Sequence, residues 1–284
     1  MLCGPCAAGP GAAASAPCQG RRVSTPAIAF QGVAKRFAAR GRSGEVLAVT
    51  DVNFAVQPGE VVSIIGPSGC GKSTLLNMGS GLAKPSAGQV AVDGETVAGP
   101  NAHVAFMLQK DLLMPWRTIA QNIEFGLELR GVASTERARV STRLLHQCHL
   151  DGFGAHYPHQ LSGGMRQRAA LARTLAVDPL VLLMDEPFSA LDAQTKMILQ
   201  QDLAQTVASE GKTVLFITHD LAEAVALSDR ILVMSERPGT IVEQITVSLP
   251  ERHNPMKRRK HDDLGRLVAR LMDLLKLDAN THVH

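Results

Sequence analysis

The chain has 284 residues, of which 45% are hydrophobic and 19% are charged, and its formal net charge at pH 7 is +3. Such a chain can bury a substantial core in one compact unit, and so small a positive excess does not indicate the clustered cations of a nucleic-acid surface. No apolar run of about 18 residues predicts a membrane span, and the first residues lack the charged-then-apolar pattern of a secretory signal, so we expect a soluble protein that stays in the cytosol.

The first segment, residues 1–26, is rich in Ala, Gly, Pro and Ser, a composition that predicts a disordered leader. Cys3 and Cys6 have the C-x-x-C spacing of thioredoxin-like redox centres. Such a centre needs a helix N-terminus behind a strand, which this context does not offer. We therefore expect one folded domain at 27–284, and the sequence does not assign a chemical role to the cysteine pair.

Short apolar stretches follow from Ala27 to Val56, interrupted by a glycine- and charge-rich turn at Gly41–Glu45, and they predict antiparallel strands. Val61–Ile65 is a continuous apolar run of strand length. Glycines follow it and lead into a helix-like stretch at Lys72–Met78, so this region is a strand, loop and helix unit.

Further apolar runs predict buried strands at Val104–Met107, Leu180–Met184, Val214–Ile217 and Ile231–Met234. Helical stretches separate the later runs, which indicates a mostly parallel sheet covered by helices. Residues from about 111 to 176 are rich in helix formers and predict a helical subdomain. At about 263–277, apolar residues recur at helical spacing, and we expect this amphipathic terminal helix to pack against the domain.

A glycine-rich segment lies between the strand at Val61–Ile65 and the helix that follows it. Its residues match the P-loop pattern G-x-x-x-x-G-K-[ST] and are Gly66, Pro67, Ser68, Gly69, Cys70, Gly71, Lys72 and Ser73, with Thr74 next in the helix. Glycines allow backbone amides to surround phosphate oxygens, and the helix N-terminus adds positive potential. We expect Lys72 to reach the β and γ phosphates of a nucleotide and Ser73 to bind Mg²⁺.

Two carboxylates, Asp185 and Glu186, follow the apolar run Leu180–Met184, in the form of a Walker B strand. Open α/β sheets bind ligands at this edge. We expect Asp185 to hold Mg²⁺ through water and Glu186 to polarise the attacking water as general base. Together with the P-loop these residues predict a nucleotide hydrolase, and GTPases, small-molecule kinases and helicases all remain open at this point.

The segment from Leu161 to Arg168, Leu-Ser-Gly-Gly-Met-Arg-Gln-Arg, resembles the signature motif of the ABC ATPases and lies upstream of Asp185, as that family requires. Ser162, Gly163 and Gly164 offer a hydroxyl and bare amides to a γ phosphate. The resemblance, over about 28–250, implies a P-loop NTPase of the α/β class with a mostly parallel core sheet, an N-terminal antiparallel β part and the helical subdomain. It also implies a homodimer in which each signature segment contacts ATP held by the other copy.

The same resemblance assigns roles to further positions. Gln109 matches the Q-loop glutamine, which contacts Mg²⁺ and the coupling interface. Asp192, in Ser189-Ala190-Leu191-Asp192, matches the D-loop aspartate that supports communication between subunits. His219 matches the switch histidine, which contacts the γ phosphate and orients Glu186, and Phe37 resembles the aromatic residue that stacks on adenine.

Within the family, the segment from Gln109 to Thr118 and the later Arg237-Pro238-Gly239 resemble the nitrate, sulfonate and taurine importer group. The resemblance places Trp116 and Arg117 near the coupling helix of a membrane subunit. It implies membrane permease subunits and a periplasmic solute-binding protein as partners, no nucleic acid, and a peripheral location at the cytoplasmic face of the inner membrane. The solute itself is not specified, because selectivity belongs to the partners.

Three other hypotheses compete. A non-transport ABC ATPase would act on nucleic acid or the ribosome, but such members usually carry tandem cassettes or a long coiled coil, and neither is present. An exporter ATPase would differ only in partner and direction. A zinc site would need ligand pairs at C-x-x-C or H-x-x-x-H spacing, which the group around Cys148 lacks, so we expect surface histidines at His146, His149, His156 and His159.

Overall fold

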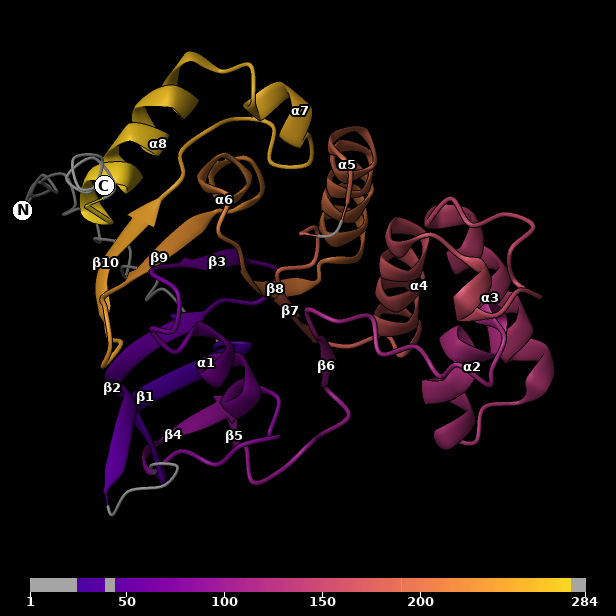
Figure 1. The fold of residues 1–284 in the computed structure, drawn as a ribbon, viewed down its shortest axis with the longest axis horizontal. Helices are drawn as coiled ribbons and strands as arrows, with labels where there is room; N and C mark the ends of the chain where they lie inside the picture. Colours follow the sequence, from indigo (N-terminus) through magenta and orange to yellow (C-terminus); the bar gives the residue numbers. More distant parts are fainter. Residues whose placement is uncertain (1–24, 39–43, 190, 277–284) are drawn as a thin grey trace, which may run out of the picture.

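The computed structural model describes residues 25–38, 44–189 and 191–276 (Figure 1). Cys3, Cys6 and nearly all of the predicted leader lie outside these residues. The strands are β1 (Ile28–Ala38), β2 (Glu45–Val56), β3 (Val61–Ile65), β4 (Ala87–Val92), β5 (Glu95–Thr96), β6 (Val104–Met107), β7 (Val181–Asp185), β8 (Thr213–Ile217), β9 (Arg230–Met234) and β10 (Ile241–Thr246). The helices are α1 (Lys72–Gly79), α2 (Ile119–Leu129), α3 (Ser134–Gln147), α4 (Gly163–Ala176), α5 (Ala193–Glu210), α6 (Leu221–Leu227), α7 (Pro255–Arg258) and α8 (Asp262–Leu274), with a 3-10 turn η1 (Pro158–Gln160).

The core sheet has the strand order β10-β9-β3-β8-β7-β6. Its strands pair in parallel from β9 through β6, and β10 pairs antiparallel with β9. Every residue of β3, β7 and β8 is buried, as expected for strands covered on both faces. The mostly parallel core predicted from the apolar runs is therefore confirmed.

A second, antiparallel sheet has the order β2-β1-β4-β5 and contains the strands predicted near the N-terminus. The rings of Phe30 on β1 and Phe54 on β2 stack with centroids 4.5 Å apart. These rings share one apolar cluster with Leu75 and Leu76 of α1 and with Val62 of β3. Because α1 packs between the two sheets, the loop before it is fixed from both sides.

Helices α2, α3 and α4 pack on one another beside the core sheet, at the right of Figure 1, within the range where we predicted a helical subdomain. Helix α2 starts at a capping box in which the amide of Gln121 donates to Thr118 Oγ1 and the amide of Thr118 donates to Gln121 Oε1. Asn122, which is fully buried, accepts a hydrogen bond from the Met114 amide (2.8 Å) and donates to the carbonyl of Arg117 (3.2 Å). The loop that carries Trp116 is thereby anchored to α2.

The C-terminal helix α8 turns its apolar residues inward. Leu271 is fully buried, and Leu264, Leu267 and Val268 are partly buried in a cluster with Val225 of α6 and neighbouring strand residues. This packing agrees with the apolar stripe in the sequence. In the described part of the chain, no helix combines the length and apolar character needed to cross a membrane.

Candidate nucleotide site

The P-loop residues occupy the turn between β3 and α1. Gly71, the residue before α1, has a φ of 108°, and a Cβ atom on it would lie 2.4 Å from Val49 Cγ1. Gly69 also has a positive φ, of 76°. Only glycine accepts this backbone without strain, so the sequence forces the loop to curl tightly between the end of β3 and the wall formed by β2.

This turn borders a cavity of about 340 Å³ at the carboxyl edge of the core sheet. The residues that line it are Ala48, Ser68, Gly69, Gly71, Lys72, Ser73, Thr74, Asp185, Glu186, Ile217 and Arg237. The lining combines P-loop amides and two cations with the two Walker B carboxylates. A site with this chemistry fits a polyphosphate together with a hard divalent cation.

Lys72 is held by the loop itself, because its amine donates to the carbonyls of Gly66 (2.8 Å) and Pro67 (2.9 Å). A phosphate oxygen is a charged and therefore stronger acceptor than a carbonyl. The Lys72 side chain is therefore kept at the edge of the P-loop, where it can exchange a carbonyl acceptor for a phosphate oxygen.

Asp185, at the end of β7, is 9% exposed. Burial raises the pKa of its carboxyl, while a hydrogen bond from the Ser73 hydroxyl works in the opposite direction. The two side chains present adjacent oxygen ligands, which is the donor type that Mg²⁺ selects, so these residues fit the predicted metal.

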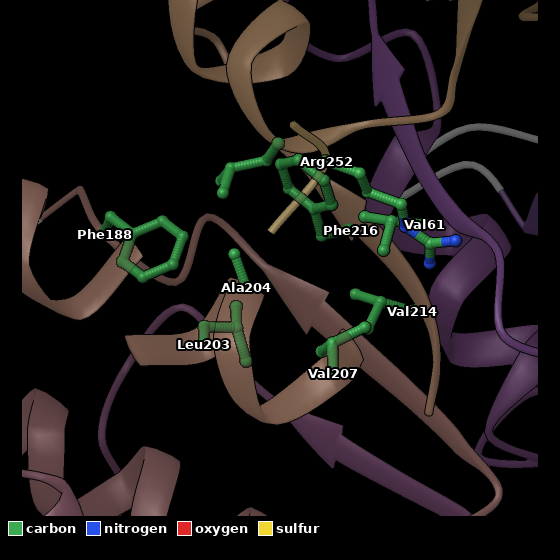
Figure 2. Close-up of a pocket in the computed structure, with 9 residues that line it drawn as sticks. Val61, Phe188, Leu203, Ala204, Val207, Val214, Phe216 and Arg252 are labelled. Atoms are coloured by element: carbon green, nitrogen blue, oxygen red, sulfur yellow. The ribbon is translucent and has the colours of Figure 1, made fainter. Parts of the chain in front are cut away.

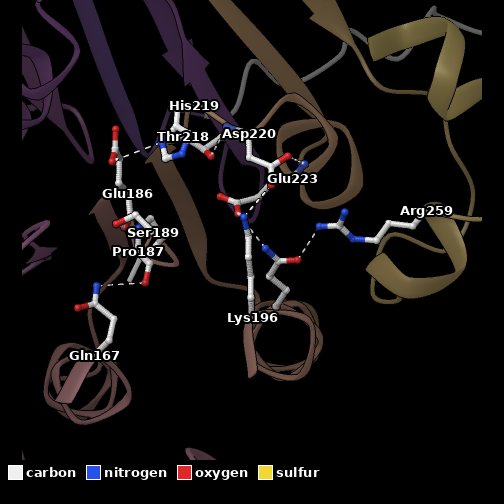
Figure 3. Close-up of polar contacts among 11 residues, drawn as sticks. Gln167, Glu186, Pro187, Ser189, Lys196, Thr218, His219, Asp220, Glu223 and Arg259 are labelled. Carbon is white, nitrogen blue, oxygen red and sulfur yellow. Dashed lines mark hydrogen bonds and ion pairs between the residues drawn. The ribbon is translucent and has the colours of Figure 1, made fainter. Parts of the chain in front are cut away.

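Glu186, Gln109 and His219 converge above this pair, and Figure 3 shows the contact of Glu186 with His219. Gln109 Nε2 donates to Glu186 Oε2 at 3.0 Å, and His219 Nδ1 lies 3.4 Å from the same oxygen. Gln109 follows β6, Glu186 follows β7 and His219 follows β8, so three neighbouring parallel strands deliver them to one edge. Glu186 has a φ of 47° and is held by hydrogen bonds from its amide to the Ile217 carbonyl and from the Ser189 hydroxyl to its own carbonyl.

The predicted signature residues lie elsewhere. Ser162 caps α4 by accepting a hydrogen bond from the Met165 amide (3.2 Å), and Gly163 and Gly164 form the first turn. None of them lines the cavity, and α4 lies well apart from α1 in Figure 1. Within one chain, the structure therefore does not bring the signature segment to the P-loop.

The other candidates outside the cavity lining are Gly66, Pro67, Cys70, Gln109, His219, Asp192 and Phe37. Asp192 caps α5 by accepting a hydrogen bond from the Thr195 amide (3.0 Å), and hydrogen bonding to Thr195 lowers the pKa of its carboxyl. Phe37 lies near the end of β1, is 43% exposed, and has the Lys35 amine 5.3 Å from the centre of its ring. Its exposed face is free to stack on a base.

Sequence reasoning missed Arg237 as a cavity residue. The turn after β9 lies against the P-loop, because the Gly239 amide donates to the Ala48 carbonyl (2.9 Å) and a Cβ on Gly239 would lie 2.0 Å from the Cys70 carbonyl oxygen. The position of Arg237 in the turn that follows a core strand, three residues beyond its end, was the available signal, since the carboxyl ends of parallel strands share one edge.

Another connection involves Gln167 of α4, which is buried and donates from Nε2 to the Pro187 carbonyl at 3.1 Å (Figure 3). It joins the signature helix to the residue that follows Glu186. Nothing in the sequence pattern distinguishes this glutamine from a surface one.

A separate small cavity of about 20 Å³ lies inside the core between α5 and the sheet (Figure 2). Phe188, Leu203, Val207 and Phe216 line it together with other apolar residues and the stem of Arg252. It has room for about one water molecule and offers few polar partners, so it is a packing gap.

The histidines near Cys148 have other partners. His146 Nδ1 lies 3.1 Å from Asp151 Oδ1, and His149 Nε2 lies 2.8 Å from Asp202 Oδ2. Burial raises the pKa of the Cys148 thiol to about 12, so it stays protonated at neutral pH. Across residues 25–38, 44–189 and 191–276, no group of three or more His, Cys, Asp or Glu side chains is arranged to hold a metal ion.

Comparison with known proteins gives consistent matches. A family model described as ABC transporter matches residues 49–189. The taurine import ATP-binding protein TauB of Yersinia pestis is 42% identical over 231 residues, which are 80% of this chain and 90% of that protein. The nitrate import ATP-binding protein NrtD of Synechocystis sp. is 44% identical over 221 residues, which are 78% of this chain and 83% of that protein.

Solved structures agree with these matches. The dimeric structure of a bacterial ABC transporter cassette superposes with a TM-score of 0.72 at 32% identity, covering 78% of this chain and 99% of that one. A dimeric ATP-binding cassette in a post-hydrolysis state with ADP and Pi gives a TM-score of 0.71 at 31% identity, with the same coverage.

Proposed function

This chain belongs to the ABC transporter family of ATP-binding proteins, and from that premise we propose that it is the ATP-hydrolysing subunit of an importer for a small anion such as nitrate, a sulfonate or taurine. The observation that carries the ATPase assignment is the single cavity lined by Lys72, Ser73, Asp185 and Glu186. The assignment to import is supported by relatives named as taurine and nitrate import proteins at 42–44% identity.

In this function each side chain of the site has a separate task. The loop amides and Lys72 bind the β and γ phosphates of ATP, and the exposed ring of Phe37 stacks on adenine. Ser73, Asp185 and Gln109 would hold Mg²⁺, and the metal would neutralise charge on the phosphates. Glu186 accepts a proton from the attacking water, and His219 holds that carboxylate in place.

A second copy of the chain completes the site. Ser162 and the free amides of Gly163 and Gly164 stand at the positive end of α4, but they do not line the cavity of their own chain. In a head-to-tail homodimer they meet the γ phosphate held by the partner, with Asp192 close to the shared interface. The dimeric structures of related cassettes support this arrangement.

The permease contact is centred on Trp116. This indole is 73% exposed and lies on the loop between Gln109 and α2, near Leu112, which is 56% exposed. Arg117, in the loop just before α2, contacts that helix: its guanidinium lies 2.6 Å from Glu128 and 4.9 Å from the centre of the Phe125 ring. A large exposed aromatic on an anchored loop is typical of an interface hot spot, so Trp116 is the side chain offered to a coupling helix at the cytoplasmic face of the membrane.

Affinity purification of the tagged chain from its native membranes tests the importer assignment. We expect the wild-type chain to recover a membrane permease and a periplasmic solute-binding protein. The Trp116→Ala variant should lose at least about tenfold of the recovered permease, because truncating a hot-spot aromatic costs about 2 kcal/mol or more. Mass spectrometry measures the recovery of each partner.

Leu129→Ala is the matched control, because Leu129 is also 73% exposed but lies at the far end of α2. It should retain the permease, and both variants should keep wild-type basal ATP hydrolysis. Recovery of ribosomes or DNA-repair proteins in place of a permease would overturn the transport assignment while leaving the ATPase chemistry intact.

Arg237→Gln is expected to weaken binding of both ATP and ADP. The guanidinium borders the cavity beside Lys72, and removing a cation that meets a phosphate or ribose oxygen costs about 1.4 kcal/mol, or about tenfold in Kd. The loss should shrink as salt is added, since exposed charges are screened. Titration with a fluorescent nucleotide measures the affinities, and Arg139→Gln, an exposed arginine on α3, should leave them unchanged. Equal affinities for Arg237→Gln and the wild type would exclude this contact.

A further inference from the structure

The backbone on both sides of His219 is fixed, although the histidine side chain itself is 69% exposed. The next residue, Asp220, uses both carboxylate oxygens: Oδ1 accepts from the Glu223 amide (3.0 Å) and Oδ2 accepts from Lys196 Nζ (2.7 Å). The Asp220 amide also donates to Thr218 Oγ1 at 3.0 Å. The position of His219 therefore depends on the contacts that hold Asp220 and on helix α6, which begins directly after Asp220.

Lys196 of α5 reaches the carboxylates of Asp220 and Glu223 (Figure 3), and its backbone joins this segment to the D-loop. Its amine lies 2.8 Å from Glu223 Oε2 as well as contacting Asp220, and its backbone amide donates to the Asp192 carbonyl at 2.9 Å. Glu223 is 2% exposed, and burial raises the pKa of its carboxyl while the Lys196 hydrogen bond opposes that shift. Without Lys196, two carboxylates would face each other in a partly buried site with no cation between them.

The C-terminal segment reaches the same group through Gln200, which is fully buried one turn further along α5. Gln200 Nε2 donates to Glu223 Oε2 at 2.9 Å, and its Oε1 accepts from Arg259, directly after α7, at 2.8 Å (Figure 3). Hydrogen bonds thus run without a break from Arg259 to the residue beside His219.

The adjacent residue Arg258 holds the other end of α6. Its guanidinium is 3% exposed and donates to the carbonyls of Ser228 (2.8 Å) and Leu249 (3.0 Å), with the Ala226 carbonyl at 3.5 Å. A cation is favoured at a helix C-terminus, where carbonyls lack partners within the helix. Helix α6 is therefore held at its last turn by Arg258 and at its first turn by the group that ends in Arg259.

From these contacts we propose that Lys196 and Arg259 are positioning residues that set His219 against Glu186, so that α7 controls ATP hydrolysis without touching ATP. Apolar residues of α6 such as Ala224 and Val225 are already fully buried, so the helix does not need buried charges to stay docked. Buried charged groups are costly and are a poor source of stability, but they fix geometry. This inference rests on the proposed ATPase function. It assigns control of the rate of ATP hydrolysis to α7 and to Arg259, which follows it.

Arg259→Met in the full-length chain tests the proposal. We expect single-turnover ATP hydrolysis to fall about tenfold, within the range of measured couplings between distant sites, while the Kd for ATP stays within about twofold of wild type. Arg259→Lys keeps a cationic donor for Gln200 and should recover most of the rate. Arg266→Met removes an arginine that is paired on the exposed face of α8 and should have no effect. Thermal unfolding confirms that each variant is folded.

A second arm separates positioning from a general loss of stability. In a His219→Ala background, Arg259→Met should cause no further loss of the residual hydrolysis, because residues that act through one group are not additive. Equal effects of Arg259→Met with and without His219, or a parallel loss of ATP affinity, would overturn the inference, as would a wild-type rate for Arg259→Met. A wild-type chain that binds no ATP would instead contradict the proposed function itself.

Discussion

Glu186→Gln is expected to bind ATP with wild-type affinity and to hydrolyse it about 10²–10⁴ times more slowly, the usual contribution of a general base. The amide has nearly the same shape as the carboxylate but cannot accept the proton of the attacking water. Gln109 donates to Glu186 Oε2 at 3.0 Å, and an amide oxygen at that position can still accept this hydrogen bond. The geometry of the site should therefore survive while its chemistry is removed.

The same variant should accumulate as a dimer when ATP is added, because the nucleotide that joins two copies is no longer consumed. Size-exclusion chromatography with and without ATP measures the dimer, and phosphate release measures turnover. Glu236→Gln is the matched control: Glu236 is an exposed carboxylate in the turn beside Arg237 but does not line the cavity. Turnover retained by Glu186→Gln would assign the base to another residue.

Much of this fold could be predicted from local sequence. The continuous apolar runs predicted the buried parallel strands, and the glycine pattern after Val61–Ile65 predicted a turn that the structure confirms through the φ of 108° at Gly71. The resemblance to the ABC family, drawn from the signature segment beginning at Leu161, is confirmed by the family match and by relatives from taurine and nitrate import systems. These features are local because each depends on residues adjacent in the chain.

Other features depend on contacts between distant segments and leave no local pattern. Arg237 reaches the cavity because a turn more than a hundred residues beyond the P-loop packs against it. Gln200 looks like any polar residue of a helix, yet it is fully buried between Glu223 and Arg259. Arg117 pairs with Glu128, eleven residues further along the chain on α2, and no local pattern indicates this contact. Tertiary packing decides such positions, and charge and spacing alone do not reveal it.

Gly163→Asp is expected to abolish ATP-dependent dimerisation without harming the fold. Gly163 is the first residue of α4, and the nearest heavy atom to a Cβ placed there is Arg166 Nη2, at 3.9 Å. A carboxylate at this end of a helix is favourable by about 0.3–1 kcal/mol, so thermal stability should be equal to wild type or higher. Toward the γ phosphate on the partner copy, the same carboxylate is repulsive, and juxtaposed like charges cost several kcal/mol.

Hydrolysis by Gly163→Asp should therefore fall by about 10² or more, while the ATP affinity of the single chain stays unchanged because the signature segment does not line its own cavity. The decisive measurement is size-exclusion chromatography of the double variant Gly163→Asp/Glu186→Gln with ATP, which should elute as a monomer where Glu186→Gln alone elutes as a dimer. Gly163→Ala adds an uncharged methyl group without a steric clash, and in the Glu186→Gln background it should still dimerise. If the Asp variant dimerised equally well, the signature segment could not face the partner's γ phosphate. Loss of the dimer in Gly163→Asp but not in Gly163→Ala would support a nucleotide site shared by two copies. The signature segment does not line the cavity of its own chain, so a carboxylate there can repel a bound phosphate only across the dimer interface.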